Sequence, residues 1–128
     1  VQIKMTSDSL AGLHFYNAQN ESLYLLVDMA NSRLILDRHR TLNSPGFPQY
    51  AFSYYADLPN SPDSTYQLRW FKDTSSIELF INDGELVMTA LVYSQFPLTE
   101  LAFCIENGEA QFSDTRLYPL SSIWNKET

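Results

Sequence analysis

The stretch from residue 68 to residue 84, LRWFKDTSSIELFINDG, alternates short apolar runs with turn-forming residues. Side chains alternate between the two faces of a β-strand, so Ile77, Leu79 and Ile81 fall on one face here and Glu78 on the other. The Asp-Gly pair that follows readily adopts the positive φ angles of a tight hairpin. This segment therefore predicts antiparallel strands joined by close turns, and it argues against helices.

The same rhythm of short apolar runs and turn residues continues along the chain. It predicts strands at 1–6, 11–17, 22–28, 32–38, 66–72, 76–82, 85–93, 99–106 and 109–118. Hairpins are expected at residues 82–84 and at Asn107-Gly108, and residues 50–55 are a candidate edge strand. Many short strands with frequent turns are typical of an all-β, antiparallel two-sheet β-sandwich of the jelly-roll or concanavalin-like kind.

Two predictions concern burial. The runs 23–27 and 86–92 are apolar on both faces, which is typical of central strands covered on both sides. The single cysteine, Cys104, lies in the run LAFCI, which reads as a buried strand, so a packed and unreactive thiol is expected.

Size and charge restrict the classes of function. The chain has 128 residues, which indicates one domain, and its formal net charge is −7. Nucleic acid and anionic membrane surfaces would repel such a chain, whereas a neutral polysaccharide would not. The longest apolar runs are too short for a transmembrane helix, and no signal peptide is visible at the N-terminus. His14 and His39 have no partners at ligand spacing, so neither a metal nor a cofactor is predicted.

The segment LRWFKDTSSIELFINDGE, residues 68–85, closely resembles a signature of the C-terminal β-sandwich module of family-32 glycoside hydrolases. This family contains invertases, levanases, inulinases and other β-fructosidases. The signature has the form L-R-x-F-x-D-x-S-S-x-E-x-F-x-N-D-G-E. The closing run LYPLSSIW, residues 117–124, is similar to the end of that module, where the final tryptophan anchors the tail. Earlier strands at 12–16 and 34–38 are also similar.

The resemblance implies an accessory role rather than catalysis. Family-32 hydrolysis uses two carboxylates across the scissile bond, and the family places them on an N-terminal β-propeller. The motifs that carry them, W-x-N-D-P-N-G, R-D-P and E-C, do not occur here. We therefore predict no catalytic residue in this chain, and a catalytic propeller as its partner. The chain begins within a strand and without methionine, so residues 1–128 are expected to be a single module lacking that propeller and its own first strand or strands.

Several residues are candidate ligand contacts. A strip of charge comprises Arg33, Asp37, Arg38, His39 and Arg40. An arginine fork suits vicinal hydroxyls, so the strip is a candidate sugar site, with a fructan polysaccharide as the ligand. It is also a candidate docking surface for the missing domain. Ordinary solvated charge is the third interpretation and the favoured one.

Aromatic residues and one acidic residue complete the candidates. Tyr54 and Tyr55 follow a proline-rich loop and are expected in an exposed patch together with Tyr50 and Phe52. Glu78 is a lone charge in an apolar strand; a solvent-facing position or a salt bridge with Arg69 is favoured over a contact with ligand or propeller. The remaining strand aromatics, Phe15, Trp70, Phe71, Phe80, Phe103 and Phe112, are expected mostly in the core.

Two functions remain open from the sequence. One is an accessory domain that packs on a catalytic propeller and stabilises it. The other is a stand-alone fructan-binding module, which predicts a shallow pocket with convergent charged residues and an aromatic ring.

Overall fold

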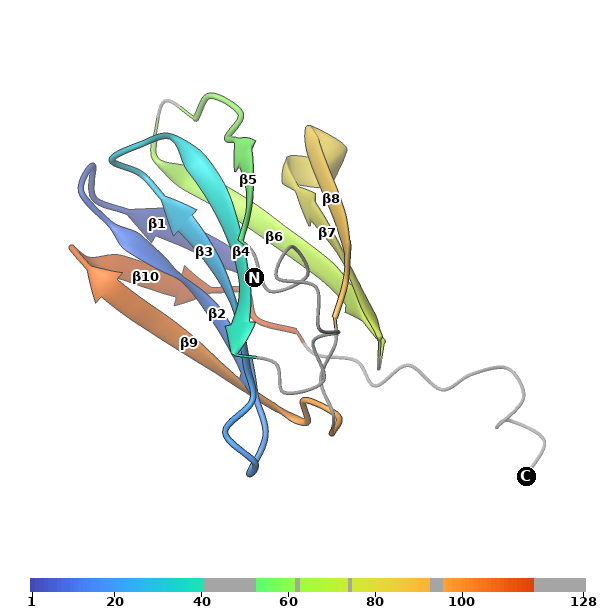
Figure 1. The fold of residues 1–128 in the computed structure, drawn as a ribbon. Helices are drawn as coiled ribbons and strands as arrows, with labels where there is room; N and C mark the ends of the chain where they lie inside the picture. Colours follow the sequence, from blue (N-terminus) through green and yellow to red (C-terminus); the bar gives the residue numbers. More distant parts are fainter. Residues whose placement is uncertain (41–52, 62, 74, 93–95, 117–128) are drawn as a thin grey trace.

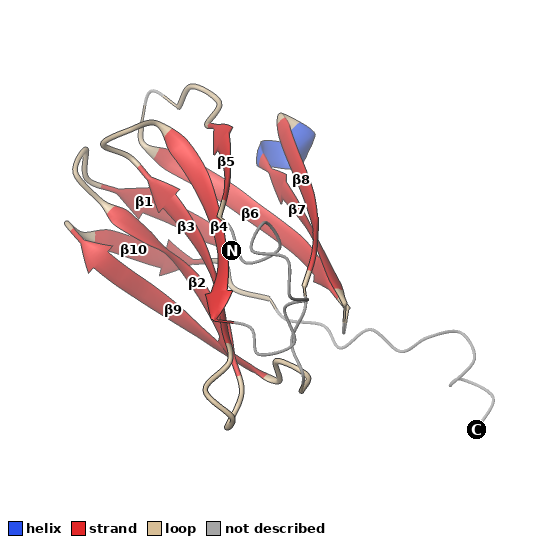
Figure 2. Ribbon diagram, viewed as in Figure 1, coloured by secondary structure: helices blue, strands red, loops and turns tan. Residues whose placement is uncertain are grey.

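The computed structural model describes residues 1–40, 53–61, 63–73, 75–92 and 96–116. The regular secondary structure of this described part is β-strand, apart from one short 3-10 helix, η2, at Asn82–Gly84 (Figure 2). Its strands are β1 (Gln2–Met5), β2 (Leu10–Tyr16), β3 (Ser22–Asp28), β4 (Arg33–Arg40), β5 (Tyr54–Asp57), β6 (Thr65–Lys72), β7 (Ser76–Ile81), β8 (Leu86–Leu91), β9 (Glu100–Asn107) and β10 (Ala110–Ser113). The predicted all-β class is confirmed.

The strands form two five-stranded sheets that lie face to face (Figure 1). The first sheet has the order β10-β1-β6-β7-β8, and the second has the order β5-β4-β3-β2-β9. Neighbouring strands pair in the antiparallel direction throughout both sheets. This is the antiparallel two-sheet sandwich that the sequence predicts.

The hydrophobic core fills the space between the sheets. Its most deeply buried members include Ile3, Leu13, Leu23, Leu34, Leu68 and Leu79. Burying one such side chain contributes about 1.5–3 kcal/mol. Ile77, Leu79 and Ile81 all face this core and Glu78 is exposed, so the alternation predicted for β7 is confirmed.

The hairpin predicted at residues 82–84 is confirmed. β7 and β8 pair from Ser76↔Leu91 to Ile81↔Leu86, and η2 connects them. Asn82, Asp83 and Gly84 all have positive φ angles, of 50°, 58° and 99°.

The hairpin predicted at Asn107-Gly108 is wrong. Gly108 does have a positive φ of 71°, but β9 belongs to the second sheet and β10 to the first. The turn is a corner between sheets, and it packs on the corner between β1 and β2. There the Thr6 amide donates to the Glu109 carbonyl at 3.1 Å, and the Asn107 side chain donates to the Asp8 carbonyl at 2.9 Å. Turn chemistry sets the local φ angles but does not choose the strand that pairs next.

Two strands that were predicted to be buried lie at sheet edges. β8 ends the first sheet, with Val87 and Leu91 52% and 53% exposed. β9 ends the second sheet and leaves Phe103 and Ile105 40% and 49% exposed. The prediction for β3 holds, since it is the middle strand of the second sheet. An apolar run alone does not distinguish a central strand from an edge strand that another unit covers.

The candidate edge strand at 50–55 is replaced by β5, which begins at Tyr54 and is the outermost strand of the second sheet. Residues 50–52 lie outside the described part of the chain, as does the closing run with Trp124. The strand predicted at 109–118 is shorter in the structure, where β10 ends at Ser113, and residues 93, 117 and 118 of the predicted strands lie outside the described part. The remaining predicted strands agree with the structure to within a few residues at each end.

Candidate functional site

Four residues of the signature lie together on the outer face of the first sheet. They are Arg69 and Phe71 of β6 and Glu78 and Phe80 of β7, and the register places Arg69 opposite Phe80 and Phe71 opposite Glu78. The Arg69 guanidinium carbon lies 5.1 Å from the centre of the Phe80 ring. The rings of Phe71 and Phe80 meet edge to face with centroids 5.9 Å apart. The block is therefore a packed, two-by-two arrangement of side chains that point away from the core.

The neighbouring edge strand extends this block. Val87 of β8 stands opposite Phe80, and Leu91 points to the same side at the end of the strand. The extended area, which we call the β6–β8 face, comprises Arg69, Phe71, Glu78, Phe80, Val87 and Leu91. It is apolar at its centre, because Phe71, Val87 and Leu91 are between 43% and 53% exposed. Its charges are one arginine and one carboxylate.

Glu78 faces solvent, as the favoured interpretation predicted. The strand register does not place Glu78 opposite Arg69, because Arg69 stands opposite Phe80 and its guanidinium lies over that ring. The structure therefore does not support the predicted salt bridge between Glu78 and Arg69.

The expectation of a core position for the strand aromatics is confirmed for Phe15 and wrong for Phe71 and Phe103, which are 43% and 40% exposed. Parity explains Phe71: it lies one residue from inward-facing Trp70 and shares a face with Arg69.

Arg38 and Tyr54 form a tight pair where the two sheets meet. The guanidinium lies 4.4 Å from the centre of the Tyr54 ring and donates hydrogen bonds to the Tyr54 hydroxyl at 3.0 Å and to the Leu91 carbonyl at 2.7 Å. Arg38 is only 1% exposed. The favoured interpretation of this residue as solvated charge is therefore wrong. It joins β4 and β5 of one sheet to the end of β8 in the other.

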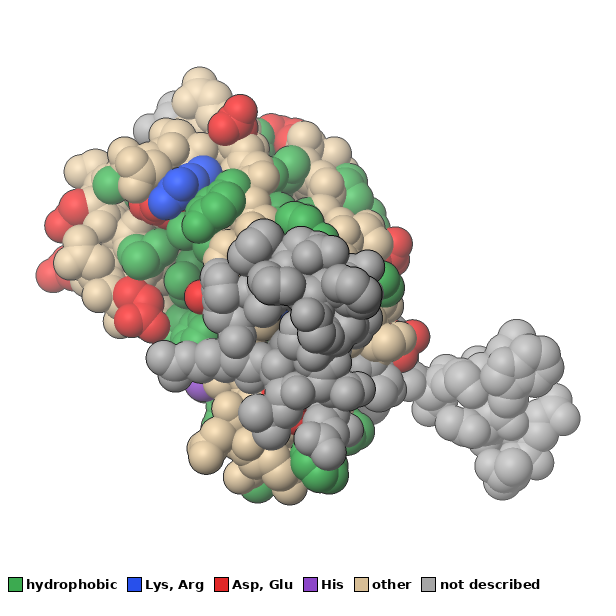
Figure 3. All heavy atoms as spheres, in the orientation of Figure 1, with side chains coloured by type: hydrophobic (Ala, Val, Ile, Leu, Met, Phe, Trp, Pro, Cys, Tyr) green, Lys and Arg blue, Asp and Glu red, His purple; other side chains and the backbone are tan. Residues whose placement is uncertain are grey.

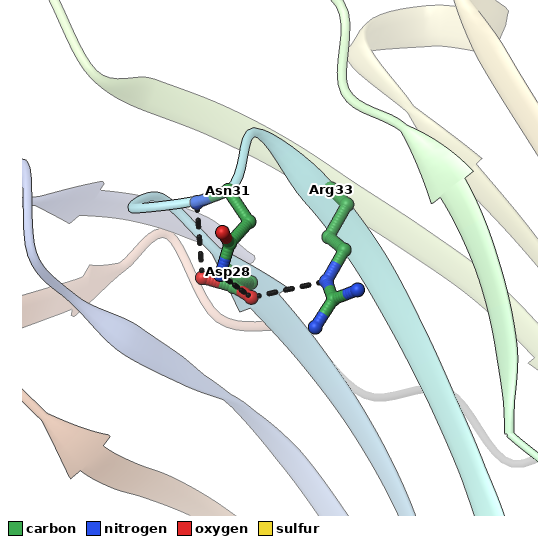
Figure 4. A network of polar contacts seen from close by, with 3 residues as sticks. All are labelled: Asp28, Asn31 and Arg33. Atoms are coloured by element: carbon green, nitrogen blue, oxygen red, sulfur yellow. Dashed lines mark hydrogen bonds and ion pairs between the residues drawn. The ribbon is translucent and has the colours of Figure 1, made fainter.

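Arg33 and Tyr55 lie on the opposite side of the same two strands. The Arg33 guanidinium lies 4.5 Å from the centre of the Tyr55 ring, and Tyr55 is 58% exposed. Arg33 also donates to the buried carboxylate of Asp28 at 3.1 Å. Asn31 donates to that carboxylate twice, from its backbone at 3.3 Å and from its side chain at 2.9 Å (Figure 4). Arg33 is thus held by the turn between β3 and β4.

The titration of Asp28 reports on this turn. Burial acts to raise its pKa, but the hydrogen bonds from Asn31 and Arg33 outweigh burial and hold the pKa below its ordinary value of 3.8. A carboxylate with a lowered pKa stabilises the fold above the unfolded-state pKa, and this stabilisation is lost as the pH falls through the lower folded-state value.

We expect Asp28→Asn to lower the free energy of unfolding by about 1–2 kcal/mol at pH 7 and to flatten its dependence on pH below about pH 4. Urea unfolding of both chains between pH 7 and pH 2 measures the effect. A difference between the two chains that stays constant across this range would contradict the assignment.

The six candidate ligand residues do not converge on one pocket. Arg33 and Tyr55 lie on the outer face of the second sheet, where Asp37 also lies, opposite Tyr24. Arg38 and Tyr54 lie on its inner side, and Glu78 belongs to the other sheet. On the face drawn in Figure 3, acidic side chains are scattered and basic ones are sparse, in keeping with the net charge.

Sequence reasoning did not find one further feature, a groove of about 930 Å³ beside β6. Its lining includes Val1, Phe15, Trp70, Phe71, Leu101 and Arg116. The groove is formed by segments that are far apart in the sequence, so no local pattern indicates it.

Cys104 is partly buried in the edge strand β9, so the prediction of a fully buried strand is wrong here too. Burial and the nearby Glu106 carboxylate raise the pKa of its thiol, which disfavours the thiolate.

No cluster of three or more His, Cys, Asp or Glu side chains suited to a metal occurs within the described ranges. Nor do those ranges include a helix with the length and apolar character needed to cross a membrane.

The fold and the outward-facing signature define a sandwich module of glycoside hydrolases, and the comparisons with known proteins agree. Residues 1–119 match the family described as "Glycosyl hydrolases family 32 C terminal". The chain belongs to this family.

Three similar proteins illustrate its relatives. A probable sucrose-6-phosphate hydrolase of Psychromonas ingrahamii is 36% identical over 87% of this chain and 18% of that protein. A levanase of Bacillus subtilis is 26% identical over 96% of this chain and 18% of that protein. The crystal structure of an exo-inulinase from Aspergillus awamori superposes with a TM-score of 0.68 at 22% identity, over 84% of this chain and 22% of that one. The chain spans about a fifth of the length of the proteins it matches.

Proposed function

We propose that this chain is the accessory lobe of a β-fructosidase, and that it docks on the catalytic propeller through the β6–β8 face. The propeller hydrolyses fructosyl linkages in sucrose, levan or inulin, and the lobe stabilises it. The observation that carries the proposal is the block of Arg69, Phe71, Glu78 and Phe80. These residues belong to the signature shared with β-fructosidases, yet their side chains point away from the hydrophobic core of this domain.

The composition of this face suits a contact between domains. Contact surfaces have an apolar centre with a few charges, and aromatic residues and arginine are enriched in them. Phe71, Val87 and Leu91 supply exposed apolar area, and Glu78 and Arg69 supply one charge of each sign. An apolar edge strand without a cover is also a site where chains aggregate, so a docked partner would protect β8.

The stand-alone fructan-binding module receives less support from the same geometry. A sugar site needs charged groups and an aromatic ring that converge on one ligand. Here the candidate arginines are engaged separately, Arg33 by Asp28 and Arg38 by Tyr54 and Leu91. We therefore favour docking.

We expect Phe71→Ser in the whole enzyme to weaken the coupling between lobe and propeller by about 2 kcal/mol, as truncation of a central aromatic residue does at contact surfaces. The enzyme should lose activity at a lower temperature, by about 2–4 °C, with its KM for sucrose unchanged. Activity remaining after heating measures this.

The matched control for this experiment is Tyr55→Ser, which removes a similarly exposed aromatic ring from the other sheet. It should leave the inactivation temperature within about 1 °C of the parent, as surface substitutions usually do. Equal losses in the two variants would show that the β6–β8 face has no special role and would defeat the proposal.

A further inference from the structure

Arg69 and Glu78 are the two charged residues of the β6–β8 face, and they occupy one diagonal of its two-by-two block. The strand register places Arg69 opposite Phe80 and Glu78 opposite Phe71, so each charge has one phenyl ring beside it on its own strand and another across from it. Diagonal neighbours on paired strands are about 7–8 Å apart, which long side chains can bridge. An ion pair between Arg69 and Glu78 is therefore within reach, and its absence has a structural cause.

The cause is the other diagonal of the block, which two aromatic rings occupy. Phe71 and Phe80 meet edge to face, with an angle of 86° between the ring planes and 5.9 Å between the centroids. The Arg69 guanidinium is turned onto the Phe80 ring, 5.1 Å from its centre. A planar guanidinium that lies over a ring is held in one orientation. The two rings thus keep Arg69 and Glu78 apart.

Both charged groups keep their capacity for hydrogen bonds. A guanidinium has five N–H donors, and an ionised carboxylate has acceptor sites on both oxygens. The side chains of Arg69 and Glu78 are exposed, and across the described residues neither of them makes an ion pair or a side-chain hydrogen bond. Arg69 differs in this respect from Arg33 and Arg38, which both donate hydrogen bonds within the domain.

A partner that covers this face removes water from both charges. Burying a charged group without an opposite charge is strongly unfavourable, so a surface that covers Phe71 must also supply groups that pair with its neighbours. The arginine fork matches a carboxylate through two parallel hydrogen bonds. A carboxylate such as that of Glu78 pairs in turn with arginine or lysine.

We propose that the surface docked on the β6–β8 face carries a carboxylate over Arg69 and a cationic side chain over Glu78, so that two separate ion pairs cross the contact. The proposal rests on the proposed function, because this surface belongs to the catalytic propeller. One charge of each sign also fixes the orientation of the partner. A partner rotated by half a turn on the face brings like charges together at both positions, and such contacts are unfavourable.

Exchanging the two charges in the whole enzyme tests whether each one has its own partner. Arg69→Glu and Glu78→Arg each place like charges across the contact, so each should raise the rate constant of heat inactivation at least about fivefold. The double variant should inactivate faster still, by about the product of the two increases, roughly 25-fold. If the double variant returns to the rate of the parent, the two residues interact with each other within the domain, and the proposal is overturned.

The matched control for the charge exchange is Arg116→Glu. It changes the net charge as Arg69→Glu does, but the Arg116 side chain is 69% exposed and forms a surface ion pair with Asp114. The rate constant should change by less than about twofold, because such pairs contribute little. If Arg116→Glu accelerates inactivation as much as Arg69→Glu does, the effect comes from the net charge and the proposal is overturned.

Chemical cross-linking detects the predicted carboxylate directly. A carbodiimide joins a lysine amine to a carboxylate in contact with it through an amide bond, and the carboxylate oxygen leaves in the urea. Arg69→Lys in the whole enzyme should become linked to an Asp or Glu outside residues 1–128, identified by mass spectrometry of linked peptides. Arg116→Lys calibrates the reaction, since it should become linked to Asp114. A link from position 69 to Glu78 alone, or none while Arg116→Lys is linked, overturns the proposal.

The experiments separate this proposal from the docking that it refines. If Phe71→Ser lowers the inactivation temperature more than Tyr55→Ser does but the charge reversals have no effect, the docking face stands and the ion pairs are rejected. If neither Phe71→Ser nor the reversals differ from their controls, docking through this face is rejected as well. Reversals that accelerate inactivation beside an ineffective Phe71→Ser leave the ion pairs in place and reject the apolar contact.

Discussion

Gly12→Ala is expected to lower the free energy of unfolding by about 3 kcal/mol. Gly12 lies in the middle of β2 and is buried. A Cβ atom at this position would overlap the carbonyl oxygen of Leu25 and lie 3.0 Å from the Cα atom of Leu26. Both belong to β3, the central strand of the second sheet, so the neighbour that must move is backbone. Glycine within a strand often marks such a close approach.

The matched control for Gly12→Ala is Gly84→Ala. Gly84 has a φ of +99° and nothing within 4 Å of the added atom, so its substitution costs only backbone strain, about 1 kcal/mol. Urea unfolding of the three chains at pH 7 measures both losses. If Gly12→Ala lowers the free energy of unfolding by no more than Gly84→Ala does, then β2 and β3 can move apart freely and their close approach at Gly12 does not affect stability.

Arg38→Met is expected to cost about 2–3 kcal/mol. The substitution keeps an apolar stem in this buried position but removes the donors that serve the Tyr54 hydroxyl and the Leu91 carbonyl. Because these bonds connect β4 and β5 to the end of β8, their loss should also loosen β8. We expect faster hydrogen exchange along β8 together with the lower stability in urea.

Arg116→Met is the control for Arg38→Met, since the Arg116 side chain is 69% exposed and its ion pair with Asp114 is at the surface. Such pairs contribute little, so its substitution should change the free energy of unfolding by less than about 0.5 kcal/mol. A comparable result for Arg38→Met would mean that the buried guanidinium does not hold the sheets together.

Local periodicity carries much of the fold prediction. The alternation of Ile77, Leu79 and Ile81 with Glu78 places one face of β7 in the core because side-chain direction depends only on neighbouring residues. The same rule would have placed Arg38 correctly, since Leu34 and Leu36 share its parity and are buried. Because Arg38 lies within a strip of charged residues, the strip as a whole was interpreted as solvated charge and the parity of Arg38 was not used.

The order of strands is not a local property, and this accounts for the errors. Asn107-Gly108 forms a turn as predicted, but the residues after it pair with β1 of the other sheet. The runs of β8 and β9 are as apolar as β3 and still lie at edges. The β6–β8 face can be found from the signature by parity, whereas the groove beside β6 is lined by segments that are far apart in the sequence.

The position of β1 has a consequence for how this domain is made. β1 lies between β10 and β6, and the corner that holds its end joins Thr6 to Glu109, which are 103 residues apart. A ribosome must therefore synthesise nearly the whole module before the first strand gains its second neighbour. Contacts between residues so distant in sequence form slowly. The strands that are synthesised first therefore keep unpaired edges until the remaining strands of the domain have been translated.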